Sequence, residues 1–125
     1  MPSYPGNSQA ILLRNNRQGH FWNNETVPAN TLSRAFQLER INRSSYPWGC
    51  SFEAFFGGIP GAFEIDIMGA NMDVIQNYVS LGTITAVNSY NVGRWDMPSN
   101  MWPKYVAAFV KTLTNAVGVT VQVTR

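Results

Sequence analysis

The residues best suited to acid–base, nucleophilic or metal chemistry are few in this chain. It contains one histidine, His20, and one cysteine, Cys50, thirty residues apart. Zinc sites need several Cys or His side chains at ligand spacing, so the sequence has no zinc pattern. A nucleophilic mechanism would have to use His20 as its base. His20 lies in a stretch dense in turn-forming residues, which favours a surface or interface position. The lone Cys50 excludes an internal disulfide and favours a buried thiol in a reducing cytosol.

The carboxylates are also poorly placed for catalysis. Glu64 and Asp66 lie two residues apart, so in a strand they share one face, and a solvated or ion-paired position is expected there rather than a hydrolase pair. Glu53 lies inside an apolar run, and a partner arginine is the expected reason for its burial. The FGGIPG motif at 56–61 lacks the pattern of a phosphate-binding loop and indicates a tight turn. We therefore predict no enzyme activity, no catalytic residue, no metal and no cofactor.

Tryptophan and arginine are the residue types that remain conspicuous. The four tryptophans each lie in or beside a segment typical of turns, and seven of the nine cationic residues are arginine. Trp and Arg are enriched among the residues that anchor protein interfaces. The alternative is that the tryptophans cap the ends of the core. The predicted partner-contact residues are Trp22, Trp48, Arg94, Trp95 and Trp102.

Composition excludes several classes of protein. Of 125 residues only 13% are charged, with a net charge of +2, whereas about 25% is typical of soluble domains. Polarity comes instead from 13 Asn, 9 Ser, 8 Thr and 5 Gln. This excludes a disordered chain, a disulfide scaffold and a basic nucleic-acid-binding face. No apolar run is long enough to span a bilayer, and the first residues lack the pattern of a secretory signal. We therefore expect neither a membrane nor direct nucleic acid among its partners.

The apolar residues alternate with polar ones along much of the chain, which predicts β-strands. Turn signals separate these runs, and the segment 72–80 is the one candidate for a short helix, although a strand fits it equally well. We predict an all-β, jelly-roll-like β-sandwich or barrel. The predicted strands cover 34–41, 62–67, 83–88, 105–113 and 117–125, of which 105–113 is apolar on both faces and is therefore expected to be central.

The first thirty residues differ from the remainder. They are rich in turn formers and contain only two short apolar islands, at 9–13 and 20–22. We interpret residues 1–30 as an extended N-terminal arm or a pair of edge strands, with an ordinary irregular terminus as the alternative. Residues 31–125 are predicted to form a single β-sandwich domain.

The segment from Pro47 to Arg125 resembles the small jelly-roll-like decoration, or cement, proteins of tailed bacteriophage capsids. The resemblance is carried by YPWGCSFEAFFGGIPGAFEID, by MWPKYVAAFVKTL and by the valine-alternating end VTVQVTR. It implies a non-enzymatic virion structural protein, made in the host cytoplasm, that binds the outside of the capsid shell. Such a protein bridges neighbouring subunits of the major capsid protein, often as a homo-oligomer such as a dimer or trimer.

Two other functions share these sequence features. One is another virion component: a head–tail connector, a tail-tube subunit or a fibre-base subunit. The other is a carbohydrate-binding β-sandwich, in which exposed coplanar tryptophans stack on sugar rings. The Trp95–Asp96 pair fits that second pattern in part.

Overall fold

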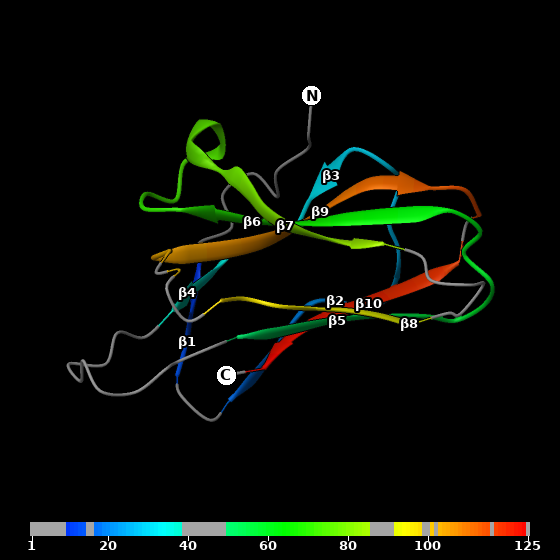
Figure 1. The fold of residues 1–125 in the computed structure, drawn as a ribbon, viewed down its shortest axis with the longest axis horizontal. Coiled ribbons are helices and arrows are strands. Elements are labelled where there is room, and N and C mark those ends of the chain that lie inside the picture. Colours follow the sequence, from blue (N-terminus) through cyan, green and yellow to red (C-terminus); the bar gives the residue numbers. More distant parts are fainter. Residues whose placement is uncertain are drawn as a thin grey trace.

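The chain folds into two β-sheets packed face to face, as a computed structural model shows (Figure 1). The structure describes residues 10–14, 17–38, 50–85, 92–98, 101, 103–115 and 117–124. Within these residues every regular element is a strand apart from one short 3-10 helix. The predicted all-β sandwich is therefore confirmed.

One sheet has six strands and the other has four in the described chain. The six-stranded sheet runs in the order β1-β4-β9-β6-β7, and β3 also pairs with β9; the four-stranded sheet runs β2-β10-β5-β8. The strands of the larger sheet are β1 (Ile11–Leu13), β3 (Thr31–Leu32), β4 (Phe36–Leu38), β6 (Phe63–Ala70), β7 (Val79–Thr85) and β9 (Tyr105–Leu113). Those of the smaller sheet are β2 (Gln18–Thr26), β5 (Ser51–Phe56), β8 (Val92–Asp96) and β10 (Gly118–Thr124).

The antiparallel strand pairs are nested in the sequence. β2 pairs with β10, β4 with β9, β5 with β8 and β6 with β7. Each of these pairs thus encloses the next one in the sequence, down to the adjacent strands β6 and β7. The consequence is that strands far apart in sequence become neighbours in each sheet.

The core between the sheets comes from the strands with the clearest alternation. Val119, Val121 and Val123 of β10 are fully buried. Ile67 of β6 is fully buried too, and Ile65 is almost so. β9 occupies 105–113, lies in the middle of its sheet and buries residues on both faces, as its composition predicts. The segment 72–80 contains both alternatives: the 3-10 helix η1 (Ile75–Asn77), followed by the first residues of β7.

The described strands near the N-terminus, β1 and β2, lie within the two sheets, as the edge-strand interpretation predicts. β1 lies at one edge of the larger sheet and β2 at one edge of the smaller, so Ile11–Leu13 and Gln18–Thr26 are edge strands. Phe21 and Trp22 of β2 are buried in the same core as the remaining strands. The core that the described strands share therefore includes residues of β2. Residues 1–9 lie outside the described part of the chain.

Two glycines close the flank of the sandwich where β7 and β8 approach each other from opposite sheets. A Cβ atom on Gly82 of β7 would lie only 2.1 Å from the Trp95 ring of β8. A Cβ atom on Gly93 of β8 would lie 2.5 Å from Ile84 of β7. Trp95 of β8 thus packs on Gly82 of β7, and Ile84 of β7 packs on Gly93 of β8. The absence of a side chain at each glycine lets two strands of different sheets come close.

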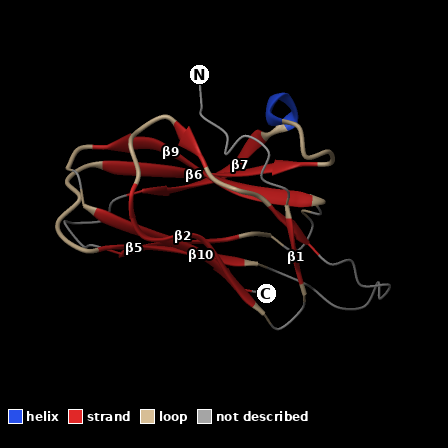
Figure 2. Cartoon of the chain, turned by 180° about the vertical axis from the view of Figure 1, so that it is seen from behind, coloured by secondary structure: helices blue, strands red, loops and turns tan. Residues whose placement is uncertain are grey.

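A second apolar layer covers part of the outer face of the larger sheet. η1 stands above this sheet at the end of β6 (Figure 2). Tyr78, next to η1, packs with Leu32 and with Ala35, Ala70 and Ala107. This layer covers only part of the outer face, on which Lys111 and Glu64 also form an ion pair at 3.8 Å.

Candidate functional site

The outer face of the four-stranded sheet gathers polar side chains from all four of its strands. Strand register places Gln18, Thr124, Ser51 and Asp96 in one row across the sheet. The next row consists of His20, Gln122, Glu53 and Arg94. All eight side chains lie on the solvent side and are half-buried or exposed. We call these two rows the polar face.

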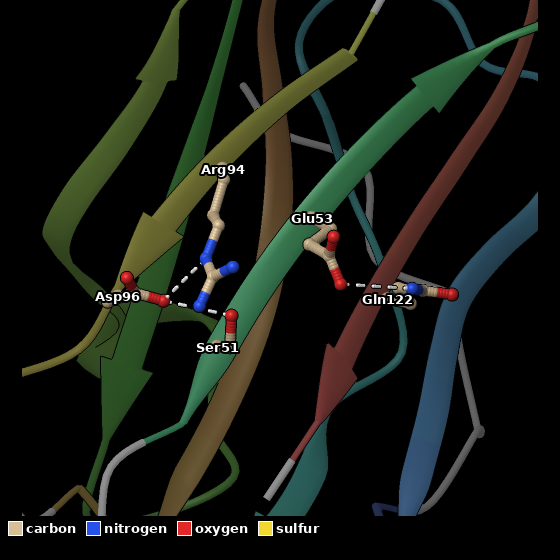
Figure 3. A network of polar contacts seen from close by, with 5 residues as sticks. All are labelled: Ser51, Glu53, Arg94, Asp96 and Gln122. Atoms are coloured by element: carbon tan, nitrogen blue, oxygen red, sulfur yellow. Dashed lines mark hydrogen bonds and ion pairs between the residues drawn. The ribbon is translucent and has the colours of Figure 1, made fainter.

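Hydrogen bonds between neighbouring strands hold part of this face in place. Figure 3 shows Arg94 and Asp96 on β8 beside Ser51 on β5, with Glu53 turned toward Gln122 on β10. The Arg94 Nε and the Ser51 hydroxyl each donate to Oδ1 of Asp96 at 2.9 Å. The Gln122 Nε2 donates to Oε1 of Glu53 at 3.3 Å. These contacts hold five of the eight side chains in defined positions, which lowers the entropy that they would lose on meeting a partner.

The arginine of the polar face, Arg94, forms an ion pair with one of its two carboxylates, Asp96. Hydrogen bonds from Arg94 and then from Ser51 lower the pKa of Asp96 below its ordinary value. The hydrogen bond to Asp96, together with its charge, raises the pKa of Arg94 further above neutrality. Both groups therefore stay ionised at neutral pH as a pair, although their side chains are 62% exposed. Such a surface attracts partners through local hydrogen bonds more than through long-range charge.

The edges of both sheets are less suited to binding than the faces, because each carries a feature that hinders the addition of another strand. β2 and β7 each contain irregularities of register against their neighbours. β8 is five residues long and carries Arg94 and Asp96, and β1 has only three residues. Contacts with a partner are therefore expected on the faces.

The five residues predicted to contact a partner lie in different environments. Arg94 is exposed on the polar face. Trp22 is only 8% exposed in the core, so its ring offers no partner-contact surface. Trp95 is half-buried and points inward, with its ring centroid 5.7 Å from that of Phe52. The alternative of tryptophans that cap the core describes both of these rings. Trp48 and Trp102 lie outside the described residues.

Sequence reasoning missed most of the polar face. The sequence does not single out Ser51 or Gln122 as contact residues, because single polar residues are common in strands with alternating polarity. Glu53 was expected to have an arginine partner, and the register does place Arg94 directly opposite it, while its hydrogen bond comes from Gln122. The alternation of SFEAFF, with every second side chain outward, was the signal that could have found Ser51 and Glu53.

Comparison with known proteins adds no family. No family model matches the chain, and no curated protein and no solved structure is significantly similar to it. Among the described residues, no three His, Cys, Asp or Glu side chains come together as metal ligands. Within the same part of the chain, no helix has the length and apolarity to cross a membrane.

Proposed function

We propose that this protein is a structural component of a phage virion, which binds the outside of the capsid shell and bridges neighbouring major capsid subunits. The observation that carries the proposal is the polar face, two rows of amide, hydroxyl and charged groups across the four-stranded sheet, in which Arg94 and Asp96 form an ion pair. The resemblance of residues 47–125 to capsid decoration proteins supports the same function. The virion is the location that follows from it.

The chemistry of the polar face suits a partner that repeats on a lattice. Ordered side chains lose little conformational entropy on binding, so many weak contacts can add up. Because Arg94 and Asp96 already neutralise each other, binding is expected to depend weakly on salt, unlike contacts between unpaired charges. A shell offers many equivalent positions, and contact with two subunits at once raises the effective affinity.

The test is co-sedimentation of the purified full chain with capsid shells of the parent virus assembled without it. We expect saturable binding that persists up to about 0.5 M salt. Arg94→Ser should weaken binding by about tenfold or more, as loss of an interface arginine does. Arg14→Ser, which removes another exposed cation, between β1 and β2, should leave binding unchanged. Absence of binding by the folded wild-type chain contradicts the proposal, and equal losses for both variants contradict the use of the polar face.

Carbohydrate binding remains a second candidate because of one side chain. Phe55 follows Ser51 and Glu53 on the outward side of β5 and lies between Thr120 and Val92 in the next row of the sheet. A half-buried ring beside planar polar groups is an arrangement on which a sugar could stack. A glycan array separates the two functions: Phe55→Ala should abolish any glycan signal, whereas shell binding without a glycan signal leaves only the virion function.

A further inference from the structure

A pocket lies on the outer face of the six-stranded sheet, beside the segment that joins β6 to β7. Its volume is about 260 Å³, and it is lined by Leu32, Met68, Ile75, Tyr78 and Phe109. Three of these residues belong to strands of the sheet, whereas Ile75 and Tyr78 come from η1, which stands above the sheet, and from the residue that follows it (Figure 2). All five lining residues are hydrophobic or aromatic, so the pocket favours the apolar part of a ligand.

The volume of the pocket limits the size of that apolar part. A cavity of about 150 Å³ lined by hydrophobic side chains can hold a benzene molecule. The pocket therefore has room for one aromatic ring with a short chain attached, but it is smaller than the sites of about 300–1,000 Å³ that hold drug-sized ligands. Tyr78 offers its ring to such a ligand, because its hydroxyl already donates to Oδ1 of Asp73 at 2.7 Å.

A buried carboxylate borders the pocket. Asp66 of β6 is only 9% exposed, and it points away from the core because both of its neighbours along the strand point into it. Register places it in one row with Leu32, Phe109 and Thr83, directly opposite Phe109. Residues directly opposite each other have Cβ atoms about 4.5–5.5 Å apart. Asp66 therefore lies next to two lining residues, Phe109 on β9 and Met68 on its own strand.

The Asp66 carboxylate has few partners for a buried acid. Within the described residues its one hydrogen bond comes from the Thr83 hydroxyl, which donates to Oδ1 at 2.7 Å. Lys111, two residues from Phe109 on β9, has its Nζ 3.8 Å from Oε2 of Glu64 instead. A carboxylate has about four acceptor positions, and buried charges are generally paired with an opposite charge. Asp66 therefore keeps acceptor positions for a donor that carries a positive charge.

We propose that this pocket binds a small primary amine with an aromatic body, whose ring lies among the five lining side chains while its ammonium group donates to Asp66. An ammonium group has three donors and a positive charge, so it supplies both the hydrogen bonds and the opposite charge that a buried carboxylate requires. A cation beside aromatic rings is also attracted by their π-electrons. The inference goes beyond the capsid function and does not require it.

A titration of the full chain, followed by nuclear magnetic resonance of its backbone amides, tests the site with phenethylamine as the probe. We expect saturable binding with a Kd of about 1 mM or below and the largest changes of chemical shift at Met68, Ile75 and Phe109. The matched ligand is phenethyl alcohol, which has the same ring and chain but a neutral end. It should bind about tenfold more weakly, because a hydrogen bond to a charged group is stronger when the donor is charged too.

Two variants separate Asp66 from other acidic residues. Asp66→Asn, which keeps the shape of the side chain, should weaken phenethylamine binding by about tenfold and leave the binding of phenethyl alcohol unchanged. Glu25→Gln is the matched control, because it removes an exposed carboxylate from the other sheet, and it should change neither affinity.

The two ligands keep the test decisive on the wild-type chain even where Asp66→Asn does not fold. The inference is overturned by the absence of phenethylamine binding, by an alcohol that binds as tightly as the amine, by shifts centred elsewhere, or by equal losses in the two variants. Butylamine, which has the length of a lysine side chain, should bind more weakly than phenethylamine because it fills less of the pocket. Equal binding of butylamine would assign the site to a lysine of a partner protein and overturn the inference as well.

Discussion

Replacing Gly82 by alanine tests the packing that closes the sandwich flank. The added methyl carbon would lie 2.1 to 2.5 Å from three atoms of the Trp95 indole, whereas carbon atoms in contact are about 3.5–4.0 Å apart. The indole, held against Phe52, must therefore move by more than an ångström. Overpacking of this kind costs about 1–3 kcal/mol. The lower flexibility of alanine in the unfolded chain returns about 0.5–1 kcal/mol.

The net loss should be about 1 kcal/mol, within a range of about 0–2.5 kcal/mol, which is a drop in Tm of roughly 4 °C for a chain of this length. Thermal unfolding followed by circular dichroism measures it. In a Trp95→Phe background the smaller ring leaves room for the methyl group, so Gly82→Ala should become nearly neutral there. Gly57→Ala is the matched control, because its Cβ would meet the nearest atom at an ordinary 3.6 Å. An equal cost in both backgrounds, or a rise in Tm for Gly82→Ala alone, would refute the reasoning.

Two further predictions concern the polar face and the N-terminal strands. Because the pKa of Asp96 is lowered in the folded state, its ion pair stabilises the fold above the unfolded-state pKa of about 3.9 and loses this effect as pH falls through the lower folded value. The Tm difference between wild type and Asp96→Asn should thus be small, positive near pH 6 and absent near pH 2; a difference that grows on acidification contradicts this. Deleting residues 1–20 removes β1 with its buried Leu13 and the first residues of β2, so cooperative unfolding should be lost; an unchanged melting curve would show that these strands are dispensable.

The sequence predicts best those strands whose side chains alternate without interruption. In β10 every second residue is a valine, and in β6 Phe63, Ile65 and Ile67 alternate with acidic residues. In both strands the apolar residues of this pattern are buried between the sheets. Burial of one face fixes both the strand and its orientation, so such patterns need no tertiary information.

Glycine and asparagine residues made two further strands, β8 and β2, hard to predict from the sequence. Gly93 makes the segment around β8 look like a turn, yet it lies within the strand because Ile84 packs against it. Asn23 and Asn24 gave β2 the composition of a loop, and Asn24 is accommodated with a positive φ of 52° where the register against β10 shifts. The contacts that explain these residues are made with a strand of the opposite sheet or with β10, near the C-terminus. Such long-range contacts cannot be recognised from the local pattern of a single sequence.

The polar face was out of reach of sequence reasoning for the same reason. His20 and Gln122 become neighbours only because β2 pairs with β10 across about one hundred residues. Arg94 and Trp95 were both predicted to contact a partner, but adjacent residues in a strand point to opposite sides. Only Arg94 therefore faces solvent, while Trp95 closes the flank of the core.

The most direct test of the proposed function is a cryo-electron microscopy comparison of capsid shells with and without the protein. The account predicts additional density at regularly repeated positions on the outer surface of the shell, spanning two neighbouring subunits, with the four-stranded sheet against the shell. Density confined to the portal vertex or the tail would contradict shell decoration and favour another virion component. No additional density at saturating protein would contradict a virion function on the shell altogether.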